Sequence, residues 1–104
     1  MTNIIENIRE QIRNVVKKAL AAATEKGLLP GIIIEDVFIE TPKEKEHGDF
    51  STNIAMVLAK QAKKAPVQIA SVLIDNMDFT DTYIQRAECA GPGFINFFLG
   101  TTWL

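Results

Sequence analysis

The stretch CAGPGFINFFL, residues 89–99, decides the predicted fold of this chain. A Gly-Pro-Gly turn at 91–93 separates it from YIQRAEC at 83–89, so we predict two strands joined by a hairpin or a tight corner. Alternate side chains of a strand point to opposite faces of a sheet. The wholly apolar face comprises Ile95, Phe97 and Leu99. The opposite face comprises Phe94, Asn96 and Phe98, and we expect helices to cover only the apolar one.

Asn96 stands between two phenylalanines, and two interpretations of this amide are open. It is either a packing compromise or a group that contacts another molecule. Unpaired RNA bases stack on aromatic rings and form hydrogen bonds through their edges. If one face of the sheet is uncovered, Phe94 and Asn96 offer both kinds of contact. We therefore predict that Asn96 is exposed and contacts RNA.

The preceding residues predict three helices and one more strand. Apolar residues recur every three or four positions from Ile5 to Ala23, which indicates a long amphipathic helix bounded by Asn3 and Gly27. The β-branched run at 32–40 predicts a strand that ends before Pro42.

A charged loop at 43–50 comes next and carries the only histidine, His47. Asp49, Ser51 and Thr52 are candidate N-caps of a helix that begins near Ile54. Pro66 is typical of the first residue of a further helix.

The order is thus helix, strand, loop, helix, helix, strand, strand. This order predicts a two-layer α+β fold, with a small antiparallel or mixed sheet and helices on one face. A length of 104 residues fits a single domain, 1–104.

Composition excludes several classes of protein. Apolar residues make up 47% and charged residues 23%, as in globular rather than disordered chains, and the net charge of −2 argues against a general nucleic-acid binder. No apolar run reaches the roughly 20 residues that span a bilayer, and the charged N-terminus is unlike a signal peptide. The single cysteine excludes an internal disulfide, so we expect a cytoplasmic protein without a membrane partner.

Two motifs, HGDFSTNIAMVLAK at 47–60 and AGPGFINFFL at 90–99, together resemble the N-terminal domain of arginyl-tRNA synthetases. With AKKAPVQIA at 62–70, the resemblance extends over residues 40–99. It implies a non-catalytic domain that contacts the D loop, at the elbow of tRNA(Arg), through Phe94 and Asn96. Related sequences have Asn-Gly-Pro-Phe-x-Gln, whereas this chain has Ala90 at the first amide, Asn96 at the second and an additional Gly93.

The same resemblance implies a parent arginine–tRNA ligase of class I, whose catalytic domain uses ATP with Mg²⁺ and L-arginine. We expect the segment to be cut from a longer, monomeric chain before that domain, which is then its partner. One histidine cannot form the His-x-Gly-His element of class I activation. We therefore expect this segment to have no catalytic residues, no metal and no cofactor.

Further RNA contacts are predicted at a lysine cluster, comprising Lys60, Lys63 and Lys64, and at His47. For the lysines, phosphate contact and a solvated helix end are equally open. For His47 and its neighbour Asp49, a local turn or helix cap competes with tRNA contact. Two other functions remain open for the domain: a structural support for the catalytic body, or a free-standing RNA-binding adaptor.

Overall fold

The computed structural model describes residues 3–34 and 36–100, which form an α+β fold as predicted. Three helices, α1 (Ile4–Glu25), α2 (Ile54–Ala62) and α3 (Pro66–Asp75), accompany a four-stranded sheet. The strands are β1 (Ile39–Glu40), β2 (Phe50–Thr52), β3 (Ile84–Ala90) and β4 (Phe94–Leu99). They pair in the order β1-β2-β4-β3, and every pair is antiparallel. A short 3₁₀ turn, η1 (Lys45–His47), lies between β1 and β2.

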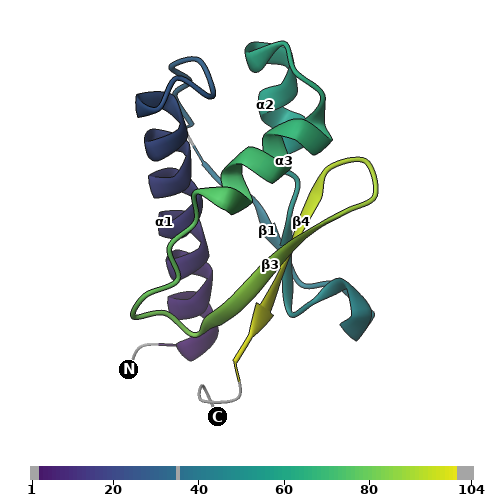
Figure 1. Cartoon of the computed structure of the whole chain (residues 1–104). Coiled ribbons are helices and arrows are strands. Elements are labelled where there is room, and N and C mark those ends of the chain that lie inside the picture. Colours follow the sequence, from purple (N-terminus) through teal and green to yellow (C-terminus); the bar gives the residue numbers. More distant parts are fainter. Residues whose placement is uncertain (1–2, 35, 101–104) are drawn as a thin grey trace.

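The long helix α1 has the boundaries that the sequence predicts. The side chain of Asn3 caps it by accepting a hydrogen bond from the Ile5 backbone N–H at 2.9 Å. Its apolar stripe, from Ile8 to Ala23, is buried. Figure 1 shows α1 standing alongside α3 and the sheet, so one helix closes a whole side of the core.

The covered face of the sheet is the one predicted from residue alternation. Ile95 and Phe97 are fully buried in the same apolar cluster as residues of α1, α2 and α3, and Leu99 packs against it half-buried. The Gly-Pro-Gly turn joins β3 to β4. A Cβ added at Gly93 would lie only 2.6 Å from the Pro66 Cβ, so the turn packs closely against the start of α3.

The predicted strand at 32–40 is largely wrong, because only Ile39–Glu40 pairs in the sheet. Ile39 lies opposite Thr52 and Glu40 opposite Ser51. An antiparallel extension of this pairing would require partners after Thr52, but the chain there turns into α2 at Ile54. The described residues just before Ile39 therefore have no strand to pair with.

The predicted N-caps of α2 are also mostly wrong, because Phe50–Thr52 is a strand at the centre of the sheet. Asp49 Oδ2 instead accepts a hydrogen bond from the Leu99 backbone N–H at 2.9 Å. Ser51 bonds across the sheet to Asn96. Thr52 alone serves the helix, since its Oγ1 accepts from the Ile54 N–H at 3.3 Å.

Within the described residues, no helix combines the length and the apolar character that crossing a lipid bilayer requires.

Candidate nucleic-acid interface

A polar row crosses the sheet on the face opposite the core. The strand register places its four members side by side: Glu40 on β1, Ser51 on β2, Asn96 on β4 and Glu88 on β3. Aromatic residues of β4 flank this row, with Phe94 opposite Ala90 and Phe98 opposite Arg86. We call this surface the outer face of the sheet.

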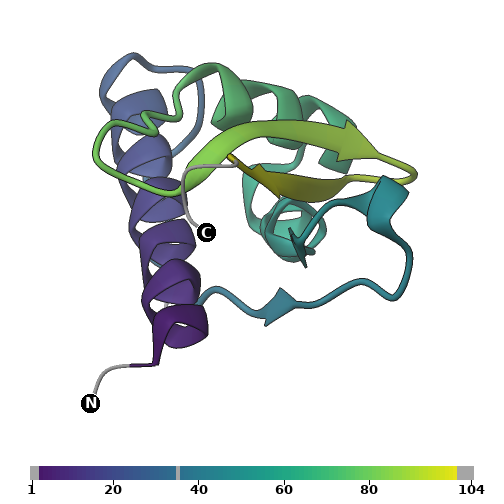
Figure 2. The ribbon, with the colours of Figure 1, turned by 90° about the horizontal axis from the view of Figure 1, so that it is seen from below.

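A hollow of about 340 Å³ opens on the outer face at the end of the hairpin. It is lined by Glu40, Pro42, His47, Ser51, Ala90, Gly91, Pro92, Phe94 and Asn96. Figure 2 shows that the chain around η1 and the β3–β4 turn lie on the same side of the molecule, and both contribute residues to the hollow. The hollow therefore depends on three separate parts of the chain.

Asn96 lies in this hollow but is not exposed, which corrects the prediction. Only 4% of its surface is accessible, because β4 lies between two strands and the loop after β1 rises beside it. Its Oδ1 accepts a hydrogen bond from Ser51 Oγ at 3.0 Å. No described residue accepts from its Nδ2, and no described side-chain polar atom is both buried and unpaired. Nδ2 is therefore not fully buried, and Asn96 lines the hollow.

Phe94 forms part of the wall of the hollow and is 37% exposed. An aromatic ring beside a donor is the arrangement that stacks an unpaired base and bonds its edge. None of the described lysines or arginines lines the hollow, and Glu40 does. Its lining therefore suits a neutral heterocycle better than a phosphate.

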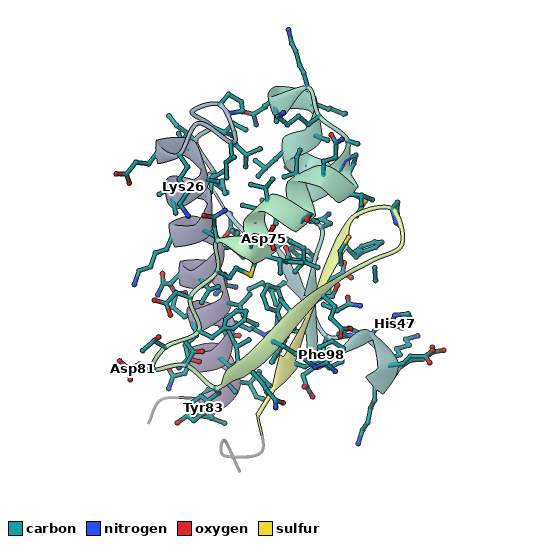
Figure 3. The ribbon with its side chains drawn as sticks, viewed as in Figure 1. Lys26, His47, Asp75, Asp81, Tyr83 and Phe98 are labelled. Carbon is teal, nitrogen blue, oxygen red and sulfur yellow. The ribbon has the colours of Figure 1, made fainter. Side chains whose placement is uncertain are left out.

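His47 joins Phe94 and Asn96 at the hollow, from the projecting η1 turn (Figure 3). Its side chain is exposed, and its Nε2 lies 3.5 Å from Glu44 Oε2 and 3.8 Å from Glu46 Oε1. Ligand atoms of these three residues lie within 4.8 Å of one another. All three side chains are exposed, and their short sequence separation accounts for the cluster without a bound ion.

The position after His47 requires a glycine, because the backbone of Gly48 lies very close to the backbone of Phe97. Its φ is +86°, and an added Cβ would lie 2.6 Å from the Phe97 carbonyl oxygen. Glycine thus lets the chain that follows η1 lie directly against β4 at Phe97. The competing interpretation of His47 as part of a local turn is correct at the backbone, and its side chain still reaches the hollow.

The structure does not bring the lysine cluster into the hollow. Lys60, Lys63 and Lys64 are exposed at the C-terminal end of α2. The hairpin turn nevertheless packs on Pro66, two residues beyond Lys64, so the lysine cluster and the hairpin lie at the same end of the molecule.

Arg86 lies on the outer face but is not among the residues predicted to contact RNA. Its Cζ lies 3.7 Å from the centre of the Phe98 ring. The signal available in the sequence was that Arg86 is the only basic residue after Lys64. Its pairing with Phe98 depends on an irregular strand register, which residue alternation does not predict.

Comparisons with known proteins agree with these features. Residues 6–99 match the family model described as the arginyl tRNA synthetase N terminal domain. The arginine–tRNA ligase of Acetivibrio thermocellus is 57% identical over 104 residues, which are 100% of this chain and 18% of that protein. The corresponding ligase of Ruminiclostridium cellulolyticum is 52% identical over the same shares. The chain thus spans less than a fifth of the length of these relatives.

Two solved structures are similar in fold. The arginyl-tRNA synthetase of Plasmodium falciparum superimposes with a TM-score of 0.69 at 16% identity, over 90% of this chain and 16% of that one. The Thermus thermophilus enzyme gives 0.60 at 24% identity, over 88% of this chain and 14% of that one. The match over residues 6–99 and the identity to whole-chain relatives show that this chain belongs to the arginyl-tRNA synthetase N-terminal domain family.

Proposed function

We propose that this chain is the non-catalytic tRNA-binding domain of an arginine–tRNA ligase, and that its hollow receives an unpaired base from the D loop of tRNA(Arg). The observation that carries the proposal is the meeting at one hollow of Phe94, which is 37% exposed, with the largely buried amide of Asn96, on the sheet face opposite the core. The names of the relatives support the ligase, since they are arginine–tRNA ligases matched over this entire chain.

The chemistry of binding follows from the lining of the hollow. A base that enters it stacks on the Phe94 ring, and Asn96 Nδ2 donates a hydrogen bond to an acceptor on the base edge. Ser51 holds the Asn96 side chain in place from the neighbouring strand. His47 and the lysine cluster contact the surrounding RNA, the lysines through phosphates.

The domain contributes tRNA affinity and no chemical step. In the proposed parent, a monomeric cytoplasmic enzyme, the catalytic domain of the same chain binds ATP with Mg²⁺ and L-arginine. The domain supports arginylation because its contact with the elbow keeps the tRNA bound for longer. The acceptor end of the tRNA then has more time to reach the catalytic domain. Loss of the contact is therefore expected to matter most when tRNA is scarce.

The test is Phe94→Ala in the full-length ligase, with tRNA(Arg) binding and arginylation as readouts. We expect the dissociation constant to rise by about 5-fold or more, because one stacked base contributes about 1–3 kcal/mol. ATP and arginine affinities are expected to stay unchanged. Phe38→Ala is the matched control, since Phe38 is 62% exposed and does not line the hollow. Equal tRNA binding by both variants and the wild type would reject the proposed contact.

A second function, structural support of the catalytic body, is favoured by a different surface. Ile33 and Val57 are 87% and 52% exposed, and both line another hollow, which lies between residues 33, 34 and 36 and the helix α2. Under this function, Ile33→Asp is expected to lower the melting temperature of the full-length ligase. Phe94→Ala would then leave arginylation unchanged.

A further inference from the structure

A break in strand register brings Arg86 onto the outer face. Ile84 pairs with Leu99, but Arg86 pairs with Phe98, so one extra residue, Gln85, is accommodated in β3. In an unbroken antiparallel register, Gln85 would lie opposite Phe98. A bulge changes the direction in which the following side chains point. Here it places the guanidinium of Arg86, rather than the amide of Gln85, beside the ring of Phe98.

The Arg86 side chain contacts Phe98 and Glu88 and is otherwise exposed to solvent. Its Cζ lies 3.7 Å from the Phe98 ring centre, within the range of a cation–π contact. It also forms an ion pair with Glu88, the neighbour of Asn96 in the polar row. The side chain of Arg86 nevertheless remains 49% exposed. A guanidinium backed by a ring in this way presents its remaining surface to solvent.

The surroundings favour a base over a phosphate as the ligand of Arg86. Glu88 already neutralises much of its charge, and Glu40 and Glu88 make the polar row acidic. A phosphate close to these carboxylates is repelled, whereas a neutral base is not. The planar guanidinium is also a surface on which unpaired bases stack.

We propose that Arg86, supported by Phe98, is a second stacking platform, which takes a different unpaired base of the RNA loop that Phe94 contacts. The inference rests on the proposed function. Phe94 and Phe98 are four residues apart on one face of β4, which places the two platforms about 13 Å apart. Asn96 lies between them, and a four-stranded sheet with aromatic residues is a known arrangement for stacking two or three bases.

The experiment measures binding of the full-length ligase to tRNA(Arg) transcripts in which each unpaired D-loop nucleotide is made abasic in turn. Arg86→Ala is expected to weaken binding of the intact transcript by about 5-fold or more. On a transcript that lacks the base bound by Arg86, Arg86→Ala and the wild type are expected to bind equally well. On a transcript that lacks a different base, Phe94→Ala and the wild type are expected to bind equally well. Arg86→Lys keeps the charge but not the planar surface, so it is expected to lose most of the same affinity.

Arg13→Ala is the control, because Arg13 is also an ion-paired arginine but lies on α1. It is expected to bind tRNA like the wild type, and each variant is checked by its melting curve. Wild-type binding by Arg86→Ala, beside weakened binding by Phe94→Ala, overturns this inference and leaves the proposed function intact. The inference is also overturned if Arg86→Ala weakens binding of every abasic transcript, or if Arg86→Lys binds tRNA as tightly as the wild type. It is overturned as well if the same abasic position abolishes the effects of both Arg86→Ala and Phe94→Ala. Wild-type binding by both Phe94→Ala and Arg86→Ala overturns the proposed function as well.

Discussion

The two faces of β4 are built from neighbouring residues but are held together by different forces. On the inner face, Ile95 and Phe97 have no accessible surface and join all three helices in one apolar core. On the outer face, Asn96 is almost as inaccessible, yet it is held by a hydrogen bond to Ser51 and borders a hollow. Burial alone therefore does not distinguish the two faces, whereas the apolar or polar chemistry of their side chains does.

The largest expected effect is on the inner face, with Phe97→Ala. Removal of this fully buried ring is expected to lower the free energy of unfolding by about 3–5 kcal/mol, because a large cavity replaces it. Chemical denaturation measures the loss. Phe38→Ala, at a 62% exposed phenylalanine, is the control and is expected to change stability by about 0.5 kcal/mol or less. Comparable stabilities of the two variants would mean that the inner face of β4 is misassigned.

A smaller effect is expected where η1 lies on β4. Gly48→Ala is expected to cost about 2 kcal/mol, because Gly48 has a φ of +86° and its new Cβ would meet the Phe97 carbonyl oxygen at 2.6 Å. The control is Gly31→Ala, whose Cβ would meet only Thr24 Cγ2, at 4.0 Å. Thermal melts give the melting temperature of each variant, and Gly48→Ala is expected to melt at a lower temperature than Gly31→Ala. Equal melting temperatures of the two variants would show that Gly48 does not closely approach β4 at Phe97.

The smallest effect sharpens the description of the outer face. Asn96→Ala and Ser51→Ala are each expected to lower stability by about 1 kcal/mol, because each removes one partner of a buried hydrogen bond. The double variant is expected to be less unstable than the sum of the two. Urea denaturation of all three variants gives the coupling. Additive losses would show that the two side chains do not interact, and wild-type stability of Asn96→Ala would restore the exposed amide that the sequence predicts.

Short-range patterns predicted most of the helices and the hairpin. The stripe from Ile8 to Ala23, the cap at Asn3 and Pro66 at the start of α3 depend on residues within a few positions of one another. The prediction failed where a partner from elsewhere decided the result. The apolar run at 32–40 has strong strand propensity, but only Ile39–Glu40 pairs in the sheet, because the chain after Thr52 becomes helical.

The sequence by itself determined which face of β4 is apolar, where the helices lie and which two motifs indicate the family, since each depends on local spacing. Only the tertiary structure decided that His47 joins Phe94 and Asn96 at one hollow, that the lysine cluster stays outside it, and that Arg86 lies over Phe98. The physical reason is that the side chains of the outer face meet through cross-strand register. The bulge at Gln85 sets the pairing of Arg86 with Phe98, and the close approach at Gly48 brings the chain after η1 against β4. Neither feature produces a periodic pattern of residues in the sequence.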